Sequence, residues 1–449
     1  MVSSPLADTI VAVATAPGKG GIGVVRVSGS EASSIAMRLL NKQPAPRVAT
    51  LCEFRHPHHH QIIDQGVALY FPAPHSFTGE DVLELQGHGG PVVMDCLLKA
   101  VVEAGARLAR PGEFSERSFL NDKMDLAQAE AVADLIDATT EAAALGAMRS
   151  LQGHFSEKIA TLAQSLMRLR LYVEAAIDFP EEEIDFLADG HILQKIEEVI
   201  SQLQELQASA KQGQLLKEGM SVVIIGRPNA GKSSLLNALT GQASAIVTPI
   251  PGTTRDLVKE TIQIEGMPLH IVDTAGIRLE AEEVEQEGIR RALLQQDLAD
   301  RILLVVDASK TPLMTEVEQQ VLSQFAAKTT LIVNKVDIAP ITNTLAHEAI
   351  ALSAKTGEGL HLLKEHLKNI MGYRPSENGT FIARRRHLTA LSLTLDCCEK
   401  AKDQLVRFKA GELVAQELKM AQDALGEITG KVTTDDLLGE IFANFCIGK

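Results

Sequence analysis

The feature that most constrains the fold of this chain is a glycine-rich turn between an apolar run and a helix-forming run, SVVIIGRPNAGKSSLLNAL, at residues 221–239. Gly226 is followed by four residues and then by Gly231, Lys232 and Ser233, which is the spacing of a P-loop. Backbone amides of such a loop wrap phosphates at a helix N-terminus. The stretch predicts a phosphate site after one strand of an α/β sheet, where Lys232 reaches the β- and γ-phosphates and Ser233 binds magnesium.

Three further short segments follow in the order typical of a GTP-binding domain. Each ends an apolar run: DTAG at 273–276, NKVD at 334–337 and SAK at 353–355. The Asp337 carboxylate can accept hydrogen bonds from N1 and the exocyclic amine of guanine, whereas adenine would leave it unpaired. We expect Asn334 to support the loop, Lys335 to pack along the base and the Ala354 amide to meet guanine O6.

The segment between the P-loop and DTAG, VTPIPGTTRD at 247–256, should supply a second magnesium ligand. Thr254 is the strongest candidate to join Ser233, and the alternative is that Thr254 caps the next strand. Ile277 raises a separate question. Ras-like enzymes carry a Gln directly after the Gly of this segment, and that Gln orients the attacking water. An aliphatic side chain cannot position water, so this role has to come from elsewhere.

The pattern of strand-forming and helix-forming residues changes along the chain. Residues 1–123 mix short β-like runs, two short helical stretches and many Gly and Pro turns, which indicates an α+β domain. Residues 124–218 and 377–449 carry apolar residues at the spacing of helices. Residues 219–376 alternate strand-like and helix-like runs, as βαβ units do. We therefore expect a multidomain α/β protein in which a Ras-like P-loop domain is inserted into one helical domain. Such insertions are tolerated when the ends of the inserted domain lie close together.

Composition describes an ordinary globular chain of 449 residues, 45% hydrophobic and 22% charged, with a net charge of −15. No apolar run reaches the ~20 residues of a membrane helix, and no signal peptide is evident, so we expect a cytoplasmic protein without membrane contact. Five scattered Cys fit a reducing compartment. Acidity argues against broad nucleic-acid coating. The run Arg384–His387 is compatible with either a local basic patch or a solvated helix start.

These motifs resemble the TrmE, Era and septin group of GTPases, in which the position of Ile277 is typically hydrophobic. The segments ARPGEFSERSFLNDKMDLAQAEAVADLIDA at 109–138 and FCIGK at the end resemble the MnmE (TrmE) family, and the likeness covers essentially the whole chain. The resemblance implies a homodimeric, potassium-activated GTPase. With the flavoprotein MnmG (GidA), such an enzyme adds a carboxymethylaminomethyl or aminomethyl group to C5 of the wobble uridine of tRNA.

The resemblance also assigns residues at the nucleotide. The Asn229 side chain and the carbonyls of Thr248, Ile250 and Thr253 would hold K⁺, which offsets transition-state charge as an arginine finger does. Glu285 would position water, although the residues alone do not separate it from its acidic neighbours in EEVEQEG. The expected GTP site comprises Asn229, Ala230, Gly231, Lys232, Ser233, Ser234, Thr248, Thr253, Thr254, Asp273, Thr274, Ala275, Gly276, Asn334, Lys335, Asp337, Ser353, Ala354 and Lys355.

A second site is implied in residues 1–123, which in the family make the dimer and bind a tetrahydrofolate derivative. The one-carbon donor would be 5,10-methylenetetrahydrofolate, with 5-formyltetrahydrofolate as its analogue. Arg26, Glu84 and Lys123 match the folate contacts, and Lys449 would join them from the C-terminal tail. Cys446 is a candidate catalytic thiol, and a buried apolar Cys is the alternative. A reactive thiol needs neighbouring cations that lower its pKa.

Other interpretations, of single segments and of the overall function, have less support in the sequence. HPHHH at 56–60 favours a solvated loop over a metal site, because only Asp64 stands near it as a further ligand. Cys397 and Cys398 are expected in the core. An Era-like ribosome-assembly GTPase is the main alternative, but it would need a basic RNA-binding module where helical sequence follows instead. A folate enzyme with a regulatory GTPase is a second alternative.

Overall fold

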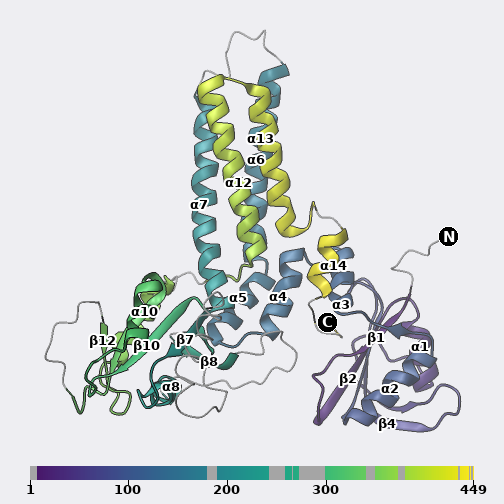
Figure 1. The fold of residues 1–449 in the computed structure, drawn as a ribbon. Helices are drawn as coiled ribbons and strands as arrows, with labels where there is room; N and C mark the ends of the chain where they lie inside the picture. The colour runs from purple at the N-terminus through teal and green to yellow at the C-terminus, as the bar shows by residue number, and fades with distance from the viewer. Residues whose placement is uncertain are drawn as a thin grey trace. The chain divides into compact units, whose positions relative to one another are not determined.

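The computed structural model describes residues 8–178, 190–241, 258–264, 266–272, 299–339, 349–372, 380–432, 435–443, 445 and 448 (Figure 1). The chain divides into two compact units. The first comprises Met1–Ala133, Ser150–Ile200 and Leu393–Lys449, and the second comprises Asp134–Arg149 and Ser201–Ser392. The expected domain boundaries at 123, 218 and 376 stay predictions.

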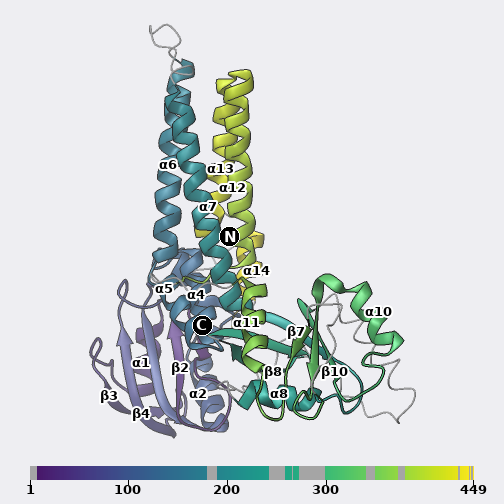
Figure 2. The same ribbon diagram turned by 90° about the vertical axis from the view of Figure 1, so that its left-hand side faces the viewer.

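The N-terminal part of the first unit is built on a six-stranded sheet with the order β3-β4-β5-β2-β1-β6. All neighbouring strands are antiparallel except β1 and β6. Helices α1 (Ala32–Leu40) and α2 (Pro91–Glu103) pack on one face and share its core (Figure 2). The strands are β1 Ile10–Val13, β2 Gly20–Ser28, β3 Thr50–Arg55, β4 Ile62–Phe71, β5 Val82–Gly89 and β6 Arg107–Leu108.

A buried arginine ties this sheet to helix α3 (Glu113–Leu120). The side chain of Arg117 is 2% exposed, and its Nη2 donates to Asp8 Oδ1 at 2.7 Å and to Glu113 Oε1 at 3.2 Å. Its Nη1 donates to the Asp8 carbonyl at 2.8 Å and to Glu80 at 3.0 Å. Hydrogen bonds from Arg107 and then Arg117 lower the pKa of Asp8. Charge can be buried here because each cation meets several acceptors.

Two long helices of the first unit pack along their length. Helices α6 (His154–Asp178) and α13 (Gly411–Thr429) lie side by side (Figures 1 and 2). Both bury an apolar residue at alternating three- and four-residue steps, which is the spacing that places side chains on one stripe of a helix. Those residues are Leu162, Leu166, Leu169 and Val173 in α6, and Val414, Leu418, Ala421, Leu425 and Ile428 in α13.

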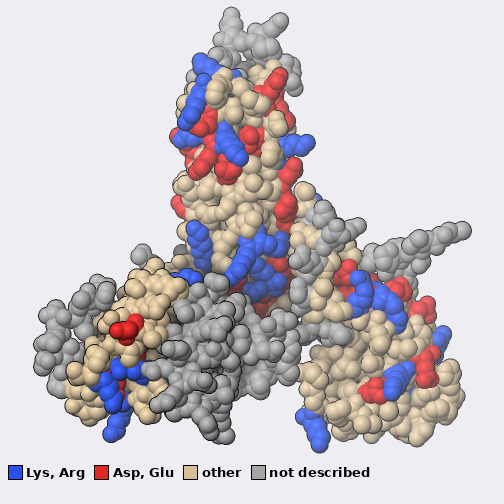
Figure 3. Space-filling model, viewed as in Figure 1, with Lys and Arg blue, Asp and Glu red and all other residues tan. Residues whose placement is uncertain are grey.

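The other helices of this helical region are α4 Leu126–Ile136, α5 Glu141–Leu151, α7 His191–Glu218, α12 Arg385–Asp403, the π-helix Gln404–Phe408 and α14 Asp435–Ala443. Helices α4, α5, α7 and α12 have residues in both units. On the face seen in Figure 3, acidic and basic side chains are interspersed along the long helices. Cys397 and Cys398 are buried in α12, as expected for core residues, and burial raises the pKa of both thiols.

The second unit contains another six-stranded sheet, with the order β12-β11-β10-β7-β9-β8. Every pair is parallel except β8 and β9. This sheet confirms the expected α/β fold, with the P-loop strand β7 inside it. Its strands are β7 Met220–Ile225, β8 Val258–Ile264, β9 Met267–Val272, β10 Arg301–Asp307, β11 Thr329–Asn334 and β12 Ala349–Ala351. Its helices are α8 Lys232–Gly241, α10 Glu316–Gln324, the short 3₁₀ turn Ala326–Lys328 and α11 Leu360–Met371.

The two chain connections of this sheet meet at one ion pair. Glu218 ends α7 just before β7, and its carboxylate accepts two bonds at 3.1 Å and one at 2.9 Å from Arg385, the first residue of α12. His270 Nε2 on β9 lies 3.1 Å from the Glu218 carbonyl oxygen. Gly219 has φ +63°, and a Cβ there would lie 2.2 Å from the Pro268 carbonyl oxygen. The α/β block is therefore inserted at a point where its ends are held together.

The basic run at 384–387 is mostly paired with acidic groups. Arg384 Nη2 and Lys217 Nζ lie 2.7 and 2.6 Å from the buried Asp134. Arg385 meets Glu218, and His387 is buried. The run does begin helix α12, but it is not the solvated start that we gave as one alternative, because Arg384 is partly buried in an ion pair and His387 is buried. At HPHHH, His56 Nε2 lies 3.2 Å from Glu103, and no cluster of three metal-ligating side chains exists among the described residues.

Breaking the Arg117 cluster should destabilise the N-terminal sheet. Arg117→Met removes a cation that Asp8 and Glu113 share with Arg107 and leaves Glu80 without its arginine, so we expect a loss at the lower end of roughly 3–5 kcal/mol. The measurement is amide hydrogen exchange of β1 and β2 in the full chain. Lys99→Met, which removes an exposed pair with Asp95, is the control and should leave exchange unchanged. Unchanged protection in Arg117→Met would show that the cluster contributes little.

Candidate functional site

The P-loop connects the carboxyl end of β7 to the first turn of α8 and depends on backbone shapes that glycine permits. Gly226 and Gly231 have φ of +147° and +97°, and Asn229 also lies in the left-handed region at +63°. A Cβ on Gly226 would lie 2.1 Å from the Val305 carbonyl oxygen, and one on Gly231 would lie 2.1 Å from Asn334 Nδ2. The glycines thus let the loop approach both β10 and β11 closely.

Asn334, at the end of β11, joins three parts of the site. Its Nδ2 donates to the Ala230 carbonyl at 2.8 Å, and its Oδ1 accepts from the Ala354 amide at 2.9 Å. Asn334 is 2% exposed, so both bonds are shielded from water. Asn334 is thus bonded to both neighbouring loops, while its role in nucleotide binding stays a prediction. The Ala354 amide, which we expected to face guanine O6, is directed at Asn334 Oδ1 instead.

The charged residues of the site divide into anchored and exposed groups. Lys232 Nζ donates to the carbonyls of Gly226 and Arg227, and thus curls over the P-loop. Lys335 Nζ lies 2.7 Å from Asp307 Oδ2. The side chains of Ser233 and Asp337 are exposed at the same carboxyl edge of the sheet, as are Asn229, Ser234 and Lys355. Parallel strands collect ligand-binding residues at this edge, so the described part of the expected site is assembled in one place.

Several expected residues lie outside the described residues, and the structure does not place them. They are Thr248, Ile250, Thr253, Thr254, Asp273, Thr274, Ala275, Gly276, Ile277, Glu285, Cys446 and Lys449.

A second polar site lies on the N-terminal sheet. Arg26 on β2 and Glu84 on β5 are direct register partners, and Arg26 Nε donates to Glu84 Oε1 at 2.9 Å. The Arg26 guanidinium lies 5.7 Å from the ring centre of Phe77 and 5.9 Å from that of Phe114. Both charged side chains are partly exposed, so a ligand can reach them. The two predicted folate contacts are thus adjacent and oriented by one another.

Lys123, which follows α3, packs against the loop after β4 and so lies near the same region. Phe77 and Thr78 accept bonds through their carbonyls from Ser118 Oγ and Asn121 Nδ2, both at 2.7 Å. A Cβ built on Gly79 would lie 3.3 Å from the Lys123 side chain. Lys123 therefore packs beside the loop whose Phe77 covers Arg26.

Gly448, near the C-terminus, contacts this sheet within the same chain. Gly448 has φ +99°, and a Cβ there would lie 2.5 Å from the Val13 carbonyl oxygen. Val13 pairs with Val25 on β2, one residue from Arg26. Upstream, Phe442 and Phe445 pack on Gly112 and on the start of α4. Gly448 therefore lies against β1, next to the strand that carries Arg26.

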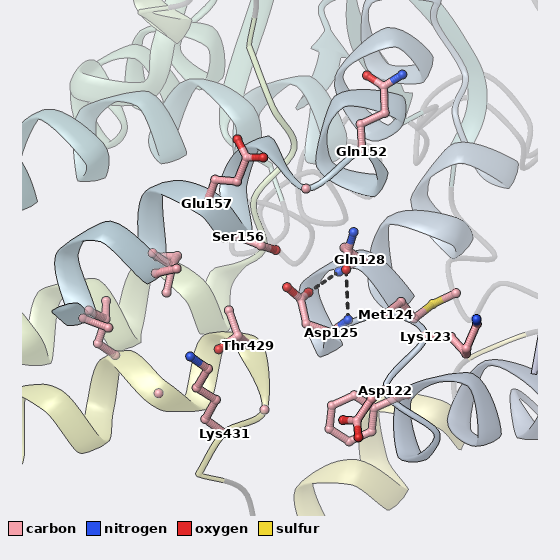
Figure 4. Close-up of a pocket in the computed structure, with 18 of the residues that line it drawn as sticks. Asp122, Lys123, Met124, Asp125, Gln128, Gln152, Ser156, Glu157, Thr429 and Lys431 are labelled. Carbon is pink, nitrogen blue, oxygen red and sulfur yellow. Dashed lines mark hydrogen bonds between the residues drawn. The ribbon is translucent and has the colours of Figure 1, made fainter. Parts of the chain in front are cut away.

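A pocket of about 760 Å³ lies between the loop after α3, the start of α6 and the end of α13 (Figure 4). Asp125 and Gln128 exchange two hydrogen bonds at its wall, 2.8 and 3.0 Å long, which cap the first turn of α4. Lys431 and Glu157 also line the pocket, so its walls carry both signs of charge. Lys123 also lines the pocket, on the side opposite to Lys431 (Figure 4).

Two family models match the sequence: the N-terminus of GTP-binding protein TrmE over residues 9–123, and the MnmE helical domain over residues 126–446. A tRNA modification GTPase MnmE from Hydrogenovibrio crunogenus is 57% identical over 448 residues, which cover 98% of this chain and 99% of the relative. The protein of the same name from Stutzerimonas stutzeri is 56% identical over 454 residues, covering 99% and 100%. The chain belongs to the MnmE family of tRNA modification GTPases.

Membership of the MnmE family confirms the resemblance drawn from the sequence, and it makes the chain a GTP-hydrolysing enzyme. Among solved structures, the G domain of the T. maritima FeoB iron transporter is 27% identical over 34% of this chain and 98% of that one, with a TM-score of 0.25. None of the helices in the described part of the chain is long and apolar enough to cross a membrane.

Three contacts of the nucleotide site were not expected from the sequence. Asp307 ends β10 and pairs with Lys335, and Arg227 in the P-loop donates to the Leu313 carbonyl at 2.6 Å. Arg227 Nε also lies 3.3 Å from the buried Glu318 Oε1, beside the capping box of α10. A charged residue at the end of a buried strand was the available signal for Asp307. No local pattern marks the pairing of Arg227.

Replacing Gly231 should separate phosphate binding from folding of the rest of the chain. In Gly231→Ala the new methyl would collide with Asn334 at a positive φ, so we expect GDP affinity to fall at least ~100-fold. Gly241→Ala, at the other end of α8 with no atom within 4 Å of the new methyl, is the matched control. Calorimetric titration with GDP measures both. Wild-type affinity in Gly231→Ala would contradict the role of this close approach.

Proposed function

We propose that this chain is a potassium-activated, magnesium-dependent GTPase that modifies C5 of the wobble uridine of certain tRNAs. It would act as a cytoplasmic homodimer with the flavoprotein MnmG, using 5,10-methylenetetrahydrofolate as the one-carbon donor. The observation that carries the proposal is the docking of Gly448 against Val13, because it brings the chain's end to the sheet that holds Arg26 and Glu84. One chain thus combines a nucleotide site with a second, separate polar site.

The nucleotide site fits GTP and magnesium by its donor set. The Ser233 hydroxyl is exposed at the N-terminus of α8, where it can take Mg²⁺, with Thr254 as the proposed second ligand. Lys232 would turn from the loop carbonyls to the phosphates. Exposed Asp337 would accept from the two donors of guanine, and Lys335 would lie along the base. These roles follow from position, charge and exposure.

Hydrolysis without a glutamine after DTAG needs other groups. We assign charge compensation to K⁺ held by Asn229, whose amide is exposed at the tip of the P-loop, and by the carbonyls of Thr248, Ile250 and Thr253. A cation beside the β- and γ-phosphates would offset charge that develops in the transition state. Glu285 would position the water. In this scheme Ile277 needs no catalytic role.

The second site fits a folate by its mixture of groups. Glu84 can accept from the donor edge of a pterin, Arg26 and Lys123 can meet carboxylates, and Phe77 offers a ring beside them. Lys449 would add a further cation from the tail, and Cys446 would be the thiol nearest the reacting carbon. When bound, methylenetetrahydrofolate supplies an electrophilic one-carbon unit. The role of the described residues is to orient it.

Potassium dependence tests the hydrolytic part of the proposal. GTP turnover should be at least ~10-fold faster in potassium than in sodium, and Asn229→Ala should remove this difference by deleting a cation ligand. Turnover is measured by phosphate release at equal ionic strength. Equal wild-type rates in the two salts would refute potassium activation.

Gly448→Val should separate the two activities. The added side chain collides with the Val13 carbonyl, so the tail should leave the sheet and tRNA modification should be lost while GTP turnover stays within about twofold of wild type. Gly439→Ala, in α14 with no atom within 4 Å of its new methyl, is the control. Full tRNA modification by Gly448→Val would show that the proposed chemistry does not need the docked tail.

Analysis of wobble uridines from a deletion strain tests the overall function. The proposal predicts unmodified C5 at those positions and restoration by the plasmid-borne gene. An Era-like role in ribosome assembly would instead leave the uridines normal and disturb ribosome profiles.

A further inference from the structure

Asp307 occupies a central place in the nucleotide site although no motif includes it. It ends β10 in direct register with Asn334 at the end of β11. The residue is 4% exposed, and its carboxylate is fully engaged. Oδ2 accepts from Lys335 Nζ at 2.7 Å, while Oδ1 accepts from the Ser309 amide at 2.9 Å and the Ser309 hydroxyl at 2.7 Å. A carboxylate buried to this extent requires such donors.

The charge state of Asp307 is fixed over the range in which enzymes work. Burial raises the pKa of the carboxyl, but the hydrogen bonds from Lys335 and Ser309 outweigh burial and bring the pKa to about 2. Because this pKa is depressed from 3.8, the pair is intact above pH 3.8 and is lost only as the pH falls through 2. Lys335 therefore meets an anion at every pH relevant to GTP turnover.

Lys335 is consequently held at both ends. Its backbone is fixed in the left-handed region, φ +68°, directly after the bridging side chain of Asn334. Its ammonium is fixed by Asp307, one strand away. The four-carbon stem between them is partly exposed, at 30% for the whole side chain, along the carboxyl edge of the sheet. A stem held at two points offers a planar base an apolar surface that is already ordered.

We propose that Asp307 is a positioning residue for guanine nucleotide binding, which acts by holding the Lys335 side chain across the base site. A free lysine loses rotamer freedom when a ligand orders it, whereas one held in place beforehand does not. Asp307 does not touch the nucleotide in this account. The inference rests on the guanine site proposed above and adds to it the residue that orders its lysine.

A purely structural role for Asp307 makes a different prediction. If Asp307 only stabilised the end of β10, its loss would lower stability and would add to the loss of Lys335. If it acts through Lys335, the two substitutions share one effect, and a double-mutant cycle shows strong coupling. Nucleotide affinity should then change far more than the rate at saturating GTP, because the reacting phosphates bind at the P-loop.

The experiment measures Kd for GDP in the full chain for wild type, Asp307→Asn, Lys335→Met and the double variant. We expect each single variant to bind GDP about tenfold more weakly and the double variant to bind no more weakly than Lys335→Met. kcat at saturating GTP should stay within about twofold for Asp307→Asn. Lys335 can reach water once Asp307 is neutral, so this variant should fold.

Ser309→Ala is the matched control, since it removes one donor to Asp307 and leaves the ion pair; it should bind GDP within about twofold of wild type. Should Asp307→Asn unfold, Asp307→Glu tests the same point by displacing the carboxylate while keeping its charge, with the same expected loss. Wild-type affinity in folded Asp307→Asn, or additive losses in the double variant, would overturn the inference. Wild-type protein that bound ADP as tightly as GDP would overturn the guanine site itself, and the inference with it.

Discussion

The nucleotide site depends on one buried amide. Asn334 joins the carbonyl of the P-loop residue Ala230 to the amide of Ala354, so three loops from three parallel strands are fixed by a single side chain. Because both bonds are shielded from water, they are stronger than exposed ones and expensive to leave unmade. The close approach that they require explains why Gly231 lacks a side chain, and it sets the position from which Lys335 extends toward Asp307.

A different solution organises the N-terminal sheet, where charges rather than an amide are buried. Arg117 connects the start of β1, the loop before β5 and helix α3, and no apolar side chain could satisfy the same carboxylates. The loop held in this way carries Phe77 over Arg26, so the stability of the sheet and the geometry of the second polar site share the same contacts. Ion pairs buried in this manner specify a geometry even where they add little net stability.

The sequence was sufficient for features that are local or that recur as contiguous motifs. The P-loop, the strand-ending NKVD segment and the helical flanks were predicted because spacing alone sets their geometry. Partnerships between distant residues were not predictable: Asp307 with Lys335, Arg227 with Glu318, and Arg26 with Glu84 join ordinary residue types whose contact depends on strand order and register. For the same reason the run at 384–387 stayed ambiguous until Asp134 and Glu218 were found beside it.

The ion pair between Glu218 and Arg385 marks where the inserted block joins its helices. Glu218 ends α7 just before the P-loop strand β7, and its carboxylate contacts the first residue of α12. Its carbonyl oxygen lies 3.1 Å from His270 Nε2 on β9, the strand that pairs with β7. A substitution at Glu218 would therefore alter the connection on both sides of the insertion at once.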